Sequence, residues 1–352
     1  MRRRGTDQVR RVLIVQTAYL GDVILATPLI RAAKTLWPEA EVDFLCIPQT
    51  AGLLEGHPLL SRLFVHDKRR ALRGLADFLP TAFALRQRHH DVALVPHPSL
   101  RSALLVAFAG AAVRVGFDRN AGRWLYTHVV PFEKEKHEVE RNLRLLDPFG
   151  GFPGPVRPEL FPSEQDRLRV QQLLEGMPGD FVAVAPGSVW PTKRWLPEGF
   201  AQVCRWLAER HDLGCVLIGG AEDGELAERV AELAGGAAVS LAGKLTPLQS
   251  AEVVRRARAL VTNDTAPLHM ASAVGTPVVA IFGPTVPEFG FGPYAVPNRI
   301  AQLDLSCRPC APHGGRRCPL GTFACMRDLS AERVYDLVVQ LLEEVKTEHG
   351  LA

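Results

Sequence analysis

Short apolar runs of strand length alternate with segments of helical spacing along almost the whole chain of 352 residues. The segment Asp22–Trp37, for example, has the apolar spacing of a helix between the first two strand-like runs. Strands and helices that alternate at this distance form parallel sheets covered on both faces, so the predicted fold class is α/β. The predicted strands are Arg11–Gln16, Glu41–Ile47, Asp91–His97, Phe181–Gly187, Gly214–Gly220, Ala259–Asp264 and Pro277–Pro284.

A stretch dense in proline and glycine, residues 147–162, interrupts the alternation and is typical of a linker. The chain length also favours two domains. We therefore expect an N-terminal domain at 1–160, a second domain at 161–330 and a last helix within 331–352. In such sheets, ligands bind at the carboxyl ends of the strands. Two sheets of this kind in one chain therefore predict a ligand-binding cleft between the domains.

Composition narrows the function classes. Apolar residues make up 47% of the chain and charged residues 22%, as in ordinary globular proteins, and the net charge of +3 is too small to indicate a nucleic-acid partner. The longest apolar run, Ala103–Val113, is bracketed by arginines and is too short to span a bilayer. The N-terminus lacks the apolar core of a signal peptide, so we expect a cytoplasmic protein.

Polar side chains gather where several of the predicted strands end. A lysine supplies a point charge for phosphate, an acid can accept ribose hydroxyls, and a helix N-terminus attracts an anion. Each residue also has a plainer interpretation, since the acids and hydroxyls can cap helices and the lysine can lie in solvent. No Gly-x-Gly-x-x-Gly is present, which disfavours a nicotinamide enzyme. In chain order these residues are Asp22, Ser188, Lys193, Glu222, Asp223, Asp264, Thr265 and His269.

Five segments, taken in order, resemble the ADP-heptose:lipopolysaccharide heptosyltransferases of glycosyltransferase family nine. They are LGDVILATPLIRAAKTLWP, HPSLRSALLVAFAGAAVRVGF, PGSVWPTKRWLPEGFAQV, TNDTAPLHMASAVGTPVVAIFGPT and CRPC…CPLGTFACMRDLS. The resemblance covers nearly the whole chain and is greatest to the heptosyltransferase II branch. It implies the GT-B class, in which two Rossmann-like doubly wound domains face a central cleft and the last helix crosses back onto the N-terminal domain. It also implies inverting transfer of L-glycero-D-manno-heptose from ADP-heptose to the inner core of lipopolysaccharide, with no metal or other cofactor required for catalysis.

The same resemblance assigns roles to residues. Asp22 matches the general base, and Lys193 matches the catalytic lysine that neutralises the donor phosphates. Ala266 stands where the family has glycine and is followed by Pro267, which lacks an N–H, so one backbone contact to phosphate is in question. For the ribose-facing acid Asp223 is the better match, with Glu222 as the alternative. The residues expected to bind ADP-heptose are Ser188, Lys193, Asp223, Leu245, Asp264, Thr265, Ala266 and His269.

The acceptor implied by the resemblance is Kdo-lipid A or heptosyl-Kdo-lipid A, and cations of the N-terminal domain would meet it. Arg101 is the first candidate because Arg–phosphate pairs are strong and geometrically specific. His97, Arg119 and Arg123 follow, although an ordinary solvated surface is the alternative for the last two. The basic runs at residues 2–4 and 68–73 are candidates for anionic lipid at the cytoplasmic face of the inner membrane, or are simply solvated.

Four of the seven cysteines, Cys307, Cys310, Cys318 and Cys325, cluster near the C-terminus. One close pair and two later thiols could form a structural zinc site. Their spacing is irregular for a zinc ribbon, however, and reduced thiols without a metal are the competing interpretation.

Two alternative functions stay open at this point. One is a related family transferase with another sugar donor or acceptor. The other is a non-catalytic nucleotide- or lipid-binding protein of the same fold.

Overall fold

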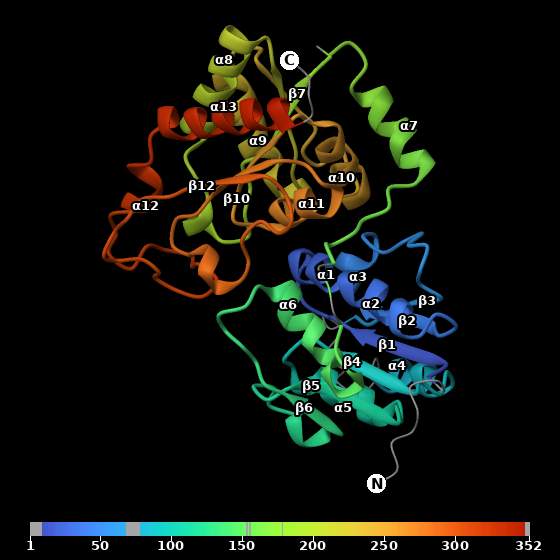
Figure 1. Ribbon diagram of the computed structural model, residues 1–352. Helices are drawn as coiled ribbons and strands as arrows, with labels where there is room; N and C mark the ends of the chain where they lie inside the picture. Colours follow the sequence, from blue (N-terminus) through green and yellow to red (C-terminus); the bar gives the residue numbers. More distant parts are fainter. Residues whose placement is uncertain (1–8, 68–77, 153, 155, 178, 349–352) are drawn as a thin grey trace. The chain divides into compact units, whose positions relative to one another are not determined.

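The computed structural model describes residues 9–67, 78–152, 154, 156–177 and 179–348, and it divides into two compact units, Met1–Phe161 and Pro162–Ala352 (Figure 1). The division lies at the C-terminal end of the predicted linker. None of the helices in the described part of the chain has both the length and the apolarity needed to cross a membrane.

The described residues of the first unit contain a six-stranded parallel sheet in the order β3-β2-β1-β4-β5-β6. Its central strands carry unbroken apolar runs because helices cover them on both faces, and residues 12–15 of β1 are fully buried. The elements are β1 (Arg11–Val15), α1 (Leu20–Ala26), α2 (Pro28–Leu36), β2 (Glu41–Cys46), α3 (Pro48–Ala51), β3 (Arg62–Val65), α4 (Phe78–Arg86), β4 (Val92–Val95), α5 (Leu100–Phe108), β5 (Val113–Phe117), η3 (Arg123–Leu125), β6 (His128–Val130), α6 (Glu138–Leu143) and η4 (Arg144–Phe149).

The second unit repeats this plan, with a six-stranded parallel sheet among its described residues in the order β12-β11-β10-β7-β8-β9. The elements are α7 (Glu164–Leu173), β7 (Phe181–Ala185), η5 (Pro191–Lys193), α8 (Pro197–His211), β8 (Gly214–Leu217), η6 (Ala221–Asp223), α9 (Gly224–Ala234), β9 (Ala238–Ser240), α10 (Pro247–Arg256), β10 (Leu260–Asn263), α11 (Ala266–Val274), β11 (Val278–Ile281), η7 (Pro287–Phe289), β12 (Asn298–Ala301), α12 (Ala324–Arg327) and α13 (Ala331–Glu348).

The last helix, α13, packs against α8, β11 and β12 of the second unit. Val334, Val338 and Leu341 are fully buried in that unit's core. The helix thus packs as part of the second unit, and its crossing onto the first domain, which the resemblance implies, stays a prediction.

The seven predicted strands are all present, and the α/β class is confirmed. The helix predicted over Asp22–Trp37 is wrong in one respect, because it is two helices that meet at Thr27 and Pro28. Proline has no N–H to donate into the preceding turn, so α1 ends and Pro28 begins α2. The strands that the sequence did not reveal, β3, β5, β6, β9 and β12, lie toward the sheet edges, where burial is incomplete and the apolar runs are short.

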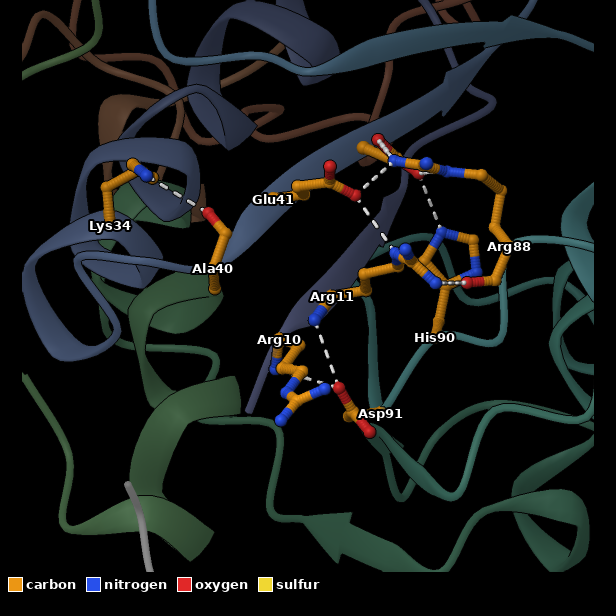
Figure 2. Close-up of polar contacts among 9 residues, drawn as sticks. Arg10, Arg11, Lys34, Ala40, Glu41, Arg88, His90 and Asp91 are labelled. Atoms are coloured by element: carbon orange, nitrogen blue, oxygen red, sulfur yellow. Dashed lines mark hydrogen bonds and ion pairs between the residues drawn. The ribbon is translucent and has the colours of Figure 1, made fainter. Parts of the chain in front are cut away.

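A network of charged side chains joins the amino ends of β1, β2 and β4 (Figure 2). The buried carboxylate of Asp43 contacts Arg88 Nε at 2.8 Å and His90 Nε2 at 2.9 Å. Burial alone would raise the pKa of Asp43, but hydrogen bonds from His90 and Arg88 hold that pKa below its ordinary value. Arg88 also pairs with Glu41, which in turn pairs with Arg11, so the network fixes three neighbouring strands at the amino edge of the first sheet.

Candidate functional site

The candidate residues for binding the sugar donor follow neighbouring strands of the second sheet. Because the strands are parallel and β10, β7, β8 and β9 are adjacent, the loops after them lie at one edge. The sequence-predicted residues sit on those loops: Ser188 and Lys193 after β7, Asp223 after β8, Leu245 after β9, and Asp264, Thr265, Ala266 and His269 after β10.

Lys193 and Asp264, which are far apart in the sequence, form an ion pair at this edge. The distance between Lys193 Nζ and Asp264 Oδ2 is 2.6 Å, and the side chains are only 12% and 7% exposed. Thr285, which follows β11 and is 2% exposed, donates its hydroxyl to the same oxygen at 2.6 Å. Sequence reasoning missed Thr285; its only signal is its place at the end of the quoted segment TNDTAPLHMASAVGTPVVAIFGPT.

Helix α11 begins directly after this pair. Thr265 is its N-cap in an extended backbone conformation, and no side-chain hydrogen bond from Thr265 caps the helix. Pro267 removes one backbone donor from the first turn, while His269 is almost fully buried. The N-terminus of a nine-residue helix beside a lysine is an arrangement that attracts an anion.

Asp223 lies against the backbone of the loop after β7. A Cβ added to Gly187 would be 2.2 Å from the Asp223 carboxyl carbon, so only glycine allows this approach. Asp223 Oδ2 accepts a hydrogen bond from Gly220 N–H at 3.1 Å. Burial raises the pKa of Asp223 above its ordinary value, and the neighbouring Glu222 adds to this. Of the two acids, Glu222 is exposed and Asp223 is half-buried, which favours Asp223 as the residue facing a ligand.

Two further residues of this edge have structural partners. Ser188 is 6% exposed, and its hydroxyl accepts a hydrogen bond from Trp190 N–H at 3.3 Å. Leu245 packs at the margin of the hydrophobic core on this face of the sheet and stays partly exposed.

In the first unit, Asp22 lies in the first turn of α1, after β1. Its Oδ2 accepts a hydrogen bond from Tyr19 N–H at 3.2 Å, so the side chain does cap the helix. Capping uses one carboxylate oxygen and does not prevent the other from acting as a base.

A buried acid near Asp22 escaped the sequence reasoning. Glu138 of α6 pairs with Arg141 at 2.8 Å, and burial raises the pKa of Glu138 to about 7 despite that pairing. The charge of Asp22 contributes to this raised pKa. Arg119, an acceptor candidate, also interacts with Asp22, and its guanidinium lies 3.7 Å above the ring of Phe132.

The other acceptor candidates have contacts and exposure of their own. His97 Nδ1 lies 3.0 Å from the hydroxyl of Thr17 and 3.2 Å from that of Ser102, which ties the ends of β1 and β4 together. Arg101 is half-buried at the start of α5, and Arg123 is exposed on η3. The basic runs at residues 2–4 and 68–73 lie outside the described residues.

The structural zinc site that four clustered cysteines would allow stays a prediction. Across the described ranges, no three His, Cys, Asp or Glu side chains are arranged to hold a metal ion. Instead Cys310 Sγ donates to the carbonyl of Cys307, Cys318 Sγ accepts from Phe323 N–H, and Cys325 is buried in the hydrophobic core.

Comparison with known proteins places these sites in a family. Residues 81–320 match the model of glycosyltransferase family 9 (heptosyltransferase). Over 278 residues the chain is 29% identical to lipopolysaccharide heptosyltransferase 3 of Escherichia coli, which covers 75% of this chain and 81% of that protein. Over 316 residues it is 28% identical to lipopolysaccharide heptosyltransferase 1 of Pseudomonas aeruginosa, with 85% and 86% covered.

A solved structure also resembles the chain. The structure of E. coli ADP-heptose lps heptosyltransferase II matches with a TM-score of 0.79 at 24% identity, over 96% of this chain and 99% of that one. The predicted GT-B class is thereby confirmed.

Proposed function

The chain belongs to glycosyltransferase family 9, the heptosyltransferases, and from this premise we propose that it moves L-glycero-D-manno-heptose from ADP-heptose to the inner core of lipopolysaccharide. We further propose that the transfer inverts the anomeric centre and that the enzyme is of the heptosyltransferase II type. The observation that carries the proposal is the buried Lys193–Asp264 pair beside the N-terminus of α11.

The chemistry of the second unit suits an ADP-sugar. The leaving ADP gains negative charge as the glycosidic bond breaks, and a lysine with a helix N-terminus stabilises that charge without a metal. We assign Lys193, Thr265 and Ala266 to the diphosphate and Asp223 to the ribose hydroxyls. Ser188, Leu245 and His269 complete the proposed donor site.

The first unit supplies the acceptor side of the proposed reaction. A sugar hydroxyl becomes a good nucleophile only while its proton is being removed, so inversion needs a base within hydrogen-bond reach of that hydroxyl. We assign this role to Asp22, with His97, Arg101, Arg119 and Arg123 as candidates for the acceptor phosphates and carboxylates.

The test of the reaction is Asp22→Asn. Asparagine keeps the size and the capping ability of the residue but cannot take a proton. Turnover with ADP-heptose and a defined Kdo-containing acceptor should fall roughly 10²–10⁴-fold, the usual range for general-base removal. ADP affinity and melting temperature should stay near those of the wild type. Near-normal turnover of this variant would reduce Asp22 to a helix cap.

A second observation supports a membrane-bound acceptor. Helices α4 and α5 pack together, with Arg86 donating to the carbonyl of Phe108, and η3 packs against α5. These three elements contain no acidic residue, and their mostly apolar sequences include Arg86, Arg101 and Arg123. We propose that this surface meets anionic lipid, since apolar and cationic side chains together favour a bilayer interface. Its exposed apolar residues are Leu79, Phe83, Leu100, Phe108 and Trp124.

Vesicles of phosphatidylglycerol test this lipid surface by co-sedimentation. The double variant Phe83→Ser and Phe108→Ser should bind these vesicles more weakly than the wild type. Leu168→Ser is the control, because Leu168 is 52% exposed on α7 of the other unit. Equal vesicle binding by all three proteins would exclude this surface while leaving the transfer reaction untouched.

A related transferase with another sugar or acceptor remains the competing proposal, because relatives of types 1 and 3 match as well as type 2 does. Mass spectrometry of the products formed from ADP-heptose and defined core acceptors separates the types. A protein that binds ADP but forms no product with any core acceptor would instead support the non-catalytic alternative.

A further inference from the structure

The cysteine-rich part of the second unit has no role in the function proposed above, yet it packs against Lys193 and holds the loop whose Thr285 binds Asp264. We call residues 308–315 the bracket segment. It begins at Arg308, between the first two clustered cysteines, and ends at Gly315. All of the contacts described below lie within the second unit.

On the Asp264 side, the bracket segment fixes the loop that follows β11. Arg308 donates to the carbonyl of Gly283 through Nε and to that of Thr285 through Nη2, the latter at 2.9 Å. The backbone N–H of Cys310 donates to the carbonyl of Pro284 at 2.9 Å. Three consecutive carbonyls are thus held, and the last of these residues, Thr285, is the one whose hydroxyl binds the Asp264 carboxylate.

On the Lys193 side, the bracket segment binds Thr192, the residue before the lysine, and packs against the aliphatic stem of Lys193. Thr192 Oγ1 accepts from Gly315 N–H at 2.7 Å and lies 2.9 Å from the carbonyl oxygen of Gly315, to which it donates. Gly314 has φ +80°, and a Cβ added there would lie 3.1 Å from Lys193 Cγ and 3.3 Å from Lys193 Cε. A side chain at Gly314 would therefore press on the lysine stem, which would have to give way by a few tenths of an ångström.

We propose that the bracket segment is the positioning element of the phosphate-binding lysine: it sets the place of Lys193 through Gly314 and Gly315, and that of Asp264 through Arg308 and Thr285. This inference rests on the proposed function for its consequence in catalysis, because the lysine must meet the donor phosphates at a defined point. A misplacement of ångström size at such a point costs on the order of 10²-fold in rate. The geometry itself can be tested without any reaction.

The test compares Gly314→Ala with Gly321→Ala. Both glycines belong to the same cysteine-rich region and have positive φ, +80° and +70°, so alanine strains the backbone in both. An added Cβ at Gly321 meets nothing within 4 Å, whereas at Gly314 it makes tight contacts with the lysine stem, which must give way by a few tenths of an ångström. The pair therefore separates a change in Lys193 placement from a general loss of stability.

Two measurements are made on the full-length variants. Reductive methylation followed by peptide mass spectrometry gives the labelling rate of Lys193, with Lys136, which is 47% exposed, as the internal reference. Calorimetry gives the affinity for ADP. We expect Gly314→Ala to label Lys193 faster and to bind ADP about tenfold more weakly than Gly321→Ala, in line with the cost of small misplacements. Equal labelling or equal ADP affinity of the two variants would overturn the inference.

Arg308→Lys provides a second arm if Gly314→Ala does not fold. Lysine keeps the positive charge but cannot hold several carbonyls with one planar group, so the Thr285 loop should loosen and Lys193 labelling should rise. Labelling at the wild-type rate would again overturn the inference. If the wild type transfers no heptose, the proposed function fails, while the labelling comparison still decides the role of the bracket segment.

Discussion

Two buried ion pairs lie at opposite ends of strands in equivalent sheets. Asp43, Arg88 and His90 meet at the amino ends in the first unit, and Lys193, Asp264 and Thr285 meet at the carboxyl ends in the second. Both groups are nearly closed to solvent, so burial and charge alone do not distinguish them.

The direction of the strands does distinguish them. At the carboxyl ends, the next helix begins and presents free backbone N–H groups, which attract an anion. At the amino ends of β2 and β4, the helices α2 and α4 finish, and a helix C-terminus presents free carbonyl groups instead. Asp43 is bound by Arg88 and His90 of the same unit, which suits a structural role, whereas Lys193 lies beside α11, where we propose that a phosphate competes with Asp264 for it. The comparison predicts that one pair governs stability and the other ligand affinity.

The largest expected effect is on stability. Arg88→Met leaves the buried Asp43 carboxylate with His90 alone, and removing one partner of a buried ion pair typically costs about 3–5 kcal/mol. In urea, the first unit should lose structure at a clearly lower concentration than in the wild type. ADP affinity below that concentration should not change.

Arg31→Met is the matched control, because Arg31 pairs with Glu159 in the same unit with 45% of its side chain exposed. An exposed pair contributes roughly 0–1 kcal/mol, so this variant should unfold almost as the wild type does. If Arg88→Met unfolded at the same urea concentration as Arg31→Met, the network at the amino ends would not contribute appreciably to stability.

The next effect concerns two buried carboxylates whose pKa values move in opposite directions. Asp43 has a lowered pKa because several donors bind it, while burial raises the pKa of Glu138 to about 7 from 4.5 although Arg141 pairs with it. Folded protein therefore takes up the Glu138 proton more readily than the unfolded chain does. The free energy of unfolding should fall as pH rises from 4.5 to 7, by up to about 3 kcal/mol from this residue.

Glu138→Gln removes that pH dependence. As pH rises from 4.5 to 7, the wild type should lose stability relative to Glu138→Gln. Above pH 7 the difference in unfolding free energy between the two proteins should stay constant. Urea titrations at several pH values measure it. A difference that does not vary with pH would mean that Glu138 is ionised throughout, as Asp43 is near neutral pH.

The sequence predicted the architecture better than it predicted the contacts within the site. Apolar runs reveal central strands, since both faces of those strands are buried, but they miss edge strands such as β6 and β12. The end of α1 before Pro28 follows from a local property of proline, which can be recognised in the sequence.

The site residues divide in the same way. Strand ends and the family resemblance placed Lys193 and Asp264 on neighbouring loops, and the sheet order brings them into contact. Thr285, Glu138 and Arg308 were missed because their roles depend on partners distant in the sequence, which no local pattern encodes. The structural-zinc interpretation of the four clustered cysteines stays a prediction, because cysteine spacing alone does not determine whether thiols bind a metal.

The smallest effect of the three is on ligand affinity, and it is the one that decides the comparison. Lys193→Met keeps most of the side-chain length but removes the charge, and a lost charge-assisted hydrogen bond costs about 1.5–3 kcal/mol. Calorimetry should therefore show ADP binding roughly ten- to a hundredfold weaker. Thr285 continues to hold Asp264 in this variant, so the melting temperature should change less than in Arg88→Met.

Lys346→Met is the control, because it makes the same change in net charge on an exposed residue of α13 and should leave ADP affinity unaltered. If Lys193→Met lost stability as Arg88→Met does and bound ADP as the wild type does, the carboxyl-end pair would be a second structural ion pair, and strand direction would not separate the two.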